Sequence, residues 1–192
     1  MSTLQKLHSQ TDPQAALLEF CTVFLGPDID LSGVRVVTPG ELPRVYRRLL
    51  VHNEHMTETL RAHHGEDVQL NVLKQMHEAP MYRRFITLTL PEGDRVVEVG
   101  MMQIDLRYTT DDIRRKIVAQ TAPLGELLVK AKVMRSIEPK WYYQFDRTCK
   151  FLDLFEDERL TAAYGRLGTI YCDNAPAIEL LEVVTDRWIR EA

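Results

Sequence analysis

Residues 82–106, with the sequence YRRFITLTLPEGDRVVEVGMMQIDL, form two apolar runs on either side of the turn sequence PEGD at residues 91–94. In the first run, residues 82–90, every second side chain points to the same side of an extended chain. Proline, glycine and aspartate between two such runs are typical of a hairpin turn. The stretch therefore predicts two antiparallel strands, which favours a sheet built from hairpins.

Two charged residues interrupt the apolar strand faces. Arg84 shares one side of its strand with three apolar residues, and Glu182 does the same within residues 177–185. An unpaired ion is strongly disfavoured in a low-dielectric interior, so such residues are normally paired. The pattern leaves two explanations open: an ion pair between Arg84 and Glu182 inside the sheet, or a charged ligand that binds beside them.

The rest of the chain divides into helical and extended segments. Helices are expected at residues 11–26, 43–65 and 109–119, with a short one beginning near residue 121. Strands are expected at residues 34–37, 68–72, 131–145, 161–171 and 177–185, whereas residues 148–159 are ambiguous and fit a helix. Hairpins between consecutive strands predict an α+β domain with an antiparallel sheet and helices gathered on one side.

The bulk properties narrow the class of protein. The 192 residues suffice for a single domain over 1–192, with a helical extension at 1–40 and a core at 45–186. The net charge of -4 and the pI near 5.9 lack the basic character of nucleic-acid binders. No apolar run reaches 18 residues, and the N-terminus has no basic and apolar leader. We therefore expect a cytoplasmic protein that binds neither nucleic acid nor membranes.

Four histidines fall in the helix expected at residues 43–65: His52, His55, His63 and His64. The segment has no HExxH arrangement, and its acidic residues fit helix-surface charges. We interpret the histidines as a solvated helix face and predict no metal site.

The sequence TAPLGELL at residues 121–128 has the features of a helix start. Thr121 can cap the helix, Pro123 suits its first turn, and Gly125 leaves room beside the first amide groups. Free amide groups at a helix start bind anions well. The segment is therefore either an ordinary cap or a site for a carboxylate.

Four short motifs, in order, resemble those of the chorismate pyruvate-lyases, which form 4-hydroxybenzoate. Residues 49–60 (LLVHNEHMTETL) are similar to the family's L-L-x-x-x-S-M-T helix, and residues 84–88 (RFITL) to its R-x-I-x-L strand. Residues 122–125 (APLG) resemble its [TD]-P-L-G helix start, and residues 176–182 (PAIELLE) its final P-x-x-x-x-[TL]-E strand. The resemblance covers about residues 45–186 and includes both buried charges.

The resemblance implies a six-stranded antiparallel sheet flanked by helices, with an enclosed pocket between them, as in the chorismate lyase-like (UTRA-like) fold. Arg84 would bind the ring carboxylate of chorismate or of the product 4-hydroxybenzoate, because a guanidinium can bind a carboxylate through two parallel hydrogen bonds. The backbone at Met56, Leu124 and Gly125 would help to hold that carboxylate. Glu182 would face the ring hydroxyl as the general acid or base, and its apolar strand should make it resist ionisation.

The reaction implied is elimination of pyruvate from chorismate, which makes the ring aromatic and requires no cofactor. Catalysis then depends on holding the substrate, excluding water and stabilising charge. A second cation is expected for the pyruvyl carboxylate, with Arg83, Arg166 and Lys140 as candidates. Arg83 should point away from Arg84 if the strand is regular.

The chain departs from the family pattern at His55, where the family helix has serine, and the N-terminal extension is longer than in the shortest members. Two other functions therefore stay open. One is a non-catalytic sensor of small aromatic acids, although residues 1–45 lack the basic helix-turn-helix of such regulators. The other is a lyase for a related enolpyruvyl substrate. The sequence leaves the oligomeric state open.

Overall fold

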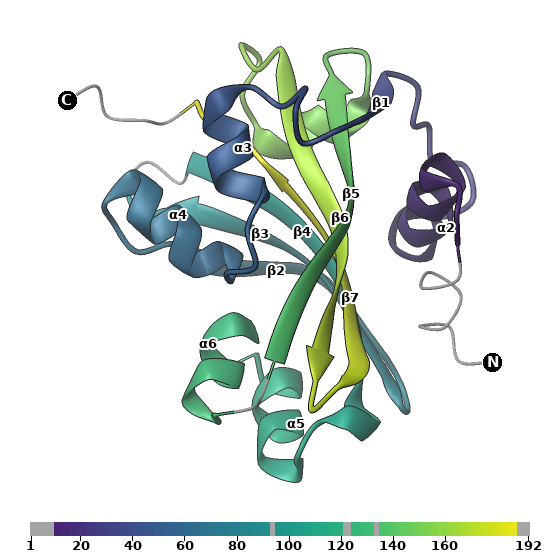
Figure 1. Ribbon diagram of the computed structural model, residues 1–192, viewed down its shortest axis with the longest axis vertical. Helices are drawn as coiled ribbons and strands as arrows, with labels where there is room; N and C mark the ends of the chain where they lie inside the picture. Colours follow the sequence, from purple (N-terminus) through teal and green to yellow (C-terminus); the bar gives the residue numbers. More distant parts are fainter. Residues whose placement is uncertain (1–9, 93–94, 121–123, 133–134, 188–192) are drawn as a thin grey trace.

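A computed structural model describes residues 10–92, 95–120, 124–132 and 135–187 (Figure 1). Seven antiparallel strands form one sheet in the order β1-β5-β6-β7-β4-β3-β2. The strands are β1 (Val34–Val37), β2 (Gln69–Glu78), β3 (Met81–Leu90), β4 (Arg95–Asp105), β5 (Arg135–Asp146), β6 (Ala162–Cys172) and β7 (Ala175–Val184). The α+β class and the antiparallel sheet are as predicted.

Helices cover both faces of this sheet. They are α2 (Pro13–Leu25), α3 (Arg44–Leu50), α4 (Met56–His64), α5 (Asp111–Val118) and α6 (Leu124–Lys130), with the 3₁₀ turns η1 (Leu106–Tyr108) and η2 (Lys150–Phe155). The helices α3 to α6 pack on one face, and α2 and η2 pack on the other. Figure 1 shows α2 alone on its side, opposite α3 and α4. The expectation that all helices gather on one side is therefore wrong.

The expected number of strands also needs correction, because the sheet has seven strands instead of six. The additional edge strand is β1, which pairs with β5 from Val34 opposite Phe145 to Val37 opposite Tyr142. The sequence pattern had indicated an extended segment there. The count of six came from the resemblance, and this chain extends that sheet by one short strand.

A single helix over residues 43–65 is not formed, since residues 51–55 separate α3 from α4. The ring of His52 bonds to this segment at both nitrogens: Nε2 lies 2.5 Å from the carbonyl oxygen of Leu49, and Nδ1 accepts from the amide of Glu54 at 3.1 Å. Side-chain bonds of this kind give the backbone an alternative to helical bonding. The helical spacing of the apolar residues therefore did not reveal the break between α3 and α4.

Other local predictions have mixed outcomes. The helix expected at residues 109–119 is formed as α5, and Thr110 caps it, with its hydroxyl accepting from the amide of Ile113 at 3.4 Å. Residues 148–159, which the sequence left ambiguous, contain a 3₁₀ turn. The turn positions 93–94 and the cap at residues 121–123 lie outside the described residues. No helix in the described part of the chain is both long and apolar enough to cross a membrane.

The helix α2 is held to the sheet by a tightly packed apolar face. Asp12 caps it, accepting from the amides of Gln14 and Ala15, and Leu17 is fully buried beneath it whereas Leu18 is 47% exposed. Burial of one leucine side chain stabilises a fold by about 1.5–3 kcal/mol before any cavity cost. The N-terminal segment from residue 12 is therefore part of the packed structure.

Replacement of Leu17 by alanine should lower the free energy of unfolding by about 2–5 kcal/mol, because it leaves a cavity under α2. The neighbouring Leu18→Ala is the matched control and should change it by less than about 0.5 kcal/mol. Urea unfolding of the two variants checks this. Equal losses would show that α2 does not pack on the sheet through Leu17.

Candidate functional site

The strand register places Arg84 and Glu182 on the same face of the sheet. Arg84 lies opposite Met102 on β4, and Met102 lies opposite Leu180 on β7. Glu182 is two residues further along β7, so its side chain points to the same side as that of Arg84. This is the face that α3 to α6 cover.

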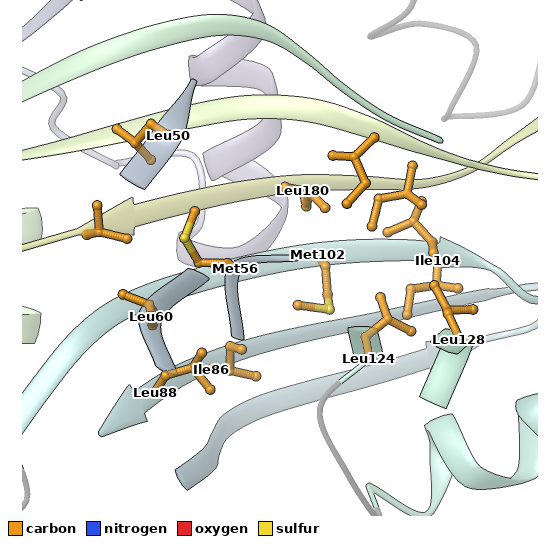
Figure 2. Packing of buried hydrophobic residues seen from close by; sticks show 14 of the residues in the cluster. Leu50, Met56, Leu60, Ile86, Leu88, Met102, Ile104, Leu124, Leu128 and Leu180 are labelled. Carbon is orange, nitrogen blue, oxygen red and sulfur yellow. The ribbon is translucent and has the colours of Figure 1, made fainter. Parts of the chain in front are cut away.

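A small cavity of about 40 Å³ lies between this face and the helices. Figure 2 shows its apolar walls: Met56 and Leu124 at the starts of α4 and α6, opposite Ile86, Leu88, Met102 and Leu180 of the sheet. Its polar lining consists of Arg84, Glu98, Glu182, His55 and Thr57. Gly125 also lines the cavity, so the structure brings together the five residues predicted to bind or convert the aromatic acid: Met56, Arg84, Leu124, Gly125 and Glu182.

The size of the cavity limits what it accepts without movement. A water molecule needs about 10–15 Å³ of such space and a cavity that binds benzene has about 150 Å³, so the cavity suits water and is too small for a benzoate ring. Methionine side chains are flexible and repack readily, and Met56 and Met102 stand on opposite walls. Entry of an aromatic acid therefore requires these walls to move apart.

The floor of the cavity is open because of Gly100. This residue lies opposite Ile86 on one side and opposite Glu182 on the other. A Cβ atom there would lie 3.0 Å from Cγ1 of Ile86 and 3.2 Å from Oε1 of Glu98, which is tighter than ordinary packing. Glycine at this position keeps the space between Arg84 and the carboxyl groups free of a side chain.

Arg84 is an almost completely buried cation, with 1% of its surface exposed. Its Nε contacts the sulfur of Met102 at 3.1 Å, and its two terminal nitrogens have no hydrogen-bond partner among the described residues. Burial lowers the pKa of its guanidinium. The geometry of these two unpartnered donors suits a carboxylate, since a planar guanidinium can bind one through two parallel hydrogen bonds.

Glu182 pairs with Arg166 instead of Arg84. Nε of Arg166 lies 2.6 Å from Oε2 of Glu182, directly across the β6–β7 ladder. The ion pair between Arg84 and Glu182, which the strand pattern had left open, is therefore not formed. The strand pattern did not predict Arg166 as the direct partner of Glu182.

Arg166 is fully engaged by other groups. Besides Glu182, its terminal nitrogens donate to the carbonyl oxygens of Leu50 at 3.1 Å, His52 at 2.8 Å and Glu54 at 3.2 Å. These carbonyls belong to the segment between α3 and α4, so Arg166 ties that segment to the sheet. It is a structural cation and is not free to bind a second carboxylate.

The two remaining candidates for a second cation do not line the cavity. Arg83 lies on the opposite face of the sheet, as expected, where its Nε donates to Gln103 at 3.4 Å. Lys140 donates to the carbonyl oxygen of Gln10 at 2.8 Å and lies over the ring of Trp141. Among the described residues that line the cavity, Arg84 is therefore the cation whose terminal nitrogens have no hydrogen-bond partner.

Glu98 is a site residue that the sequence reasoning missed. Its side chain is 2% exposed and lines the cavity, and its Oε2 has no hydrogen-bond partner among the described residues. Burial, and then the neighbouring charge of Glu182, raise the pKa of Glu98 well above its usual value. The sequence did contain an indication of this buried residue, because Glu98 is an acidic residue inside the apolar run VVEVG at residues 96–100.

His55 closes the cavity at the start of α4. A Cβ atom on Gly125 would lie only 2.7 Å from Cγ of His55, so the ring packs directly on this glycine. The Nε2 atom of His55 accepts from Nε of Arg135 at 2.5 Å. Burial, and then the charges of Arg135 and Arg166, lower the pKa of His55 to about 4, so it is neutral at physiological pH.

The histidines do not form the solvated helix face that the sequence predicted. His55 and His64 are both buried. His55 directly precedes α4, and His64 is its last residue. Within the described ranges no group of three histidine, cysteine or acidic side chains is arranged to hold a metal ion.

An outer cleft of about 270 Å³ lies between α4 and α6, next to the inner cavity. His55 and Thr57 line both spaces. The contact between His55 and Gly125 therefore stands between the outer cleft and the buried charges.

Glu98→Gln should change how stability depends on pH. A buried carboxyl with a raised pKa gives its full contribution to stability below its unfolded pKa of about 4.3 and loses it as the pH rises toward the folded-state pKa. Glutamine resembles the neutral form and does not ionise. Within that window, the free energy of unfolding of the variant should rise relative to that of the wild type by up to about 1.4 kcal/mol per pH unit.

Thermal unfolding of wild type and Glu98→Gln between pH 5 and pH 8.5 measures this difference. The exposed Glu138→Gln is the control and should show a difference from wild type that is constant with pH. A constant difference for Glu98→Gln as well would contradict the assignment of a raised pKa.

Neither a protein-family model nor a curated protein sequence matches the chain. Among solved structures, it is similar to PhnF from Mycobacterium smegmatis, with a TM-score of 0.50 and 13% sequence identity, over 92% of this chain and 80% of that one. At this identity the likeness concerns the fold alone. It supports the arrangement of the sheet and helices described above.

Proposed function

We propose that the chain binds a small cyclic carboxylic acid in the buried cavity and that it is a lyase eliminating pyruvate from chorismate to give 4-hydroxybenzoate. The observation that carries the proposal is the pair of unpartnered terminal nitrogens of Arg84 beside the cavity. A bound carboxylate would supply the partner that this buried cation lacks. The motif order at residues 45–186 supports chorismate as the source of that carboxylate.

The arrangement of polar groups fits a flat ring with different groups at its two ends. Arg84 would take the ring carboxylate, and the first amides of α4 at Met56 and of α6 at Leu124 lie on the same cavity wall. First-turn amides have no partner within their own helix. Glu182 would face the ring hydroxyl, with Met102 and Gly100 between the two ends.

Elimination at this site requires a dry chamber and a proton acceptor. The walls are apolar and α4 and α6 close over them, so water is excluded when the ligand fills the space. Glu182, which pairs with Arg166, would accept the proton that leaves C4 of the ring. Aromatisation of the ring supplies the driving force.

A sensor of aromatic acids is the second candidate, and the likeness to PhnF, a regulator, favours it. The small resting cavity also fits a domain whose shape changes when a ligand enters. Both candidates use Arg84 in the same way. They differ only in whether the bound molecule is converted.

Incubation of the protein with chorismate separates the two functions. The lyase proposal predicts equal amounts of 4-hydroxybenzoate, seen by ultraviolet absorption, and pyruvate, seen with a coupled enzymatic assay. A protein that binds 4-hydroxybenzoate but releases neither product from chorismate would be a sensor.

Arg84→Gln should weaken 4-hydroxybenzoate binding at least tenfold, because a hydrogen bond to a charged group contributes about 1.5–3 kcal/mol. Arg83→Gln is the matched control: its side chain is on the neighbouring residue and the opposite face, so affinity should be unchanged. Isothermal titration calorimetry measures both. An affinity of Arg84→Gln close to that of the wild type would remove Arg84 from the anchoring role.

A further inference from the structure

The two carboxyl groups of the cavity stand in different environments. Glu182 has a cation 2.6 Å away, whereas Oε2 of Glu98 has no partner among the described residues. When two titratable groups in one site are driven toward different protonation states, the neutral one suits an acid and the charged one a base. The difference between Glu98 and Glu182 is therefore chemically useful.

The groups that face Glu98 come from four elements. Glu182 on β7 and Arg166 on β6 are its nearest charged neighbours, and Arg84 on β3 and His55 before α4 line the same cavity. Arg166 is already paired with Glu182, and His55 is neutral. A second negative charge would be buried beside the first without a cation of its own, so Glu98 retains its proton.

Glu98 also lies at the end of the cavity away from Arg84. On β4 it is four residues from Met102, which lies opposite Arg84, and a rise of about 3.3 Å per residue separates the two Cα positions by roughly 13 Å. Gly100 between them carries no side chain. A ligand anchored at Arg84 therefore extends toward Glu98 and Glu182 together.

We propose that Glu98 is the proton donor of this cavity, acting on the leaving group at the end of the ligand away from Arg84, and that Glu182, paired with Arg166, is the matching acceptor. The inference rests on the proposed function for its chemical step. It adds Glu98 as a catalytic residue, and neither the strand pattern nor the motif resemblance had assigned that residue.

The step balances without any other reactant. Glu182 takes the proton from C4, the electrons of the C4–H bond form the new ring double bond, and the C3–O bond breaks with its electrons going to the enolpyruvyl oxygen. Glu98 gives its proton to the departing enolpyruvyl group, which leaves as pyruvate. Proton transfer from Glu182 back to Glu98 restores the site.

The test compares wild type, Glu98→Gln and the exposed control Glu138→Gln by three measurements: turnover of chorismate, calorimetric binding of 4-hydroxybenzoate, and infrared absorption of protonated carboxyl groups. Glutamine preserves shape and neutral charge, so 4-hydroxybenzoate affinity should stay within about threefold of the wild type. Turnover should fall by about 10²–10⁴-fold, as for loss of a general acid. The fall in wild-type activity at high pH should disappear from the residual rate.

The infrared measurement identifies the proton directly. At neutral pH the wild type should show a protonated carboxyl band that Glu98→Gln lacks and that 4-hydroxybenzoate shifts. Glu179, whose pKa burial raises to about 8, supplies an internal reference, because it bonds to Gln103 on the opposite face and its band should persist unshifted.

The outcomes separate the two proposals. If the wild type makes no pyruvate, yet the band is lost in Glu98→Gln and shifts with 4-hydroxybenzoate, the lyase proposal fails and Glu98 stands as the hydrogen-bond donor to the ligand. If no band is lost in Glu98→Gln, or if its turnover stays within threefold of the wild type, the inference is overturned.

Discussion

The burial of two guanidinium groups on one face of the sheet is the constraint on which the site depends. Arg166 and Arg84 are each 1% exposed, and a buried charge must find compensation within its surroundings. Arg166 finds it in Glu182 and in three backbone carbonyls, which fixes the break between α3 and α4. Arg84 finds only the sulfur of Met102 among the described residues.

That contrast is the basis of the proposed binding site. The fold retains an uncompensated cation next to a cavity, with Gly100 keeping the floor open toward two carboxyl groups. Such an arrangement lowers stability in the empty state, and a ligand carboxylate regains part of that energy when it binds. Because the resting space is only water-sized, binding and widening of the cavity are coupled, and movement near His55 and Gly125 would control entry.

Much of the sheet could be predicted from the sequence, since alternation at β3 and the hairpin turn each depend on local residues alone. The common face of Arg84 and Glu182 followed from the same alternation. The partner of Glu182 could not be predicted, because its pairing with Arg166 depends on which strand lies beside β7. Glu98 lies on a strand buried on both faces, so alternation could not assign it to a face of the sheet, and its position inside the apolar run at residues 96–100 was the available indication.

The break after Leu50 shows the limit of helical periodicity. Apolar residues at helical spacing stand on both sides of residues 51–55, and the tertiary contact with Arg166 and the ring of His52 explain why the helix stops there. This break directs α4 so that Met56 faces the sheet (Figure 2). The position of one site residue thus depends on a contact between segments more than 100 residues apart in sequence.

A crystal structure of the protein grown with 4-hydroxybenzoate tests the central claim most directly. The expected result is a ligand carboxylate within hydrogen-bond distance of both terminal nitrogens of Arg84, with the ring between Met56 and Met102 and the hydroxyl toward Glu98 and Glu182. A ligand bound in the outer cleft, with Arg84 still unpartnered, would contradict it.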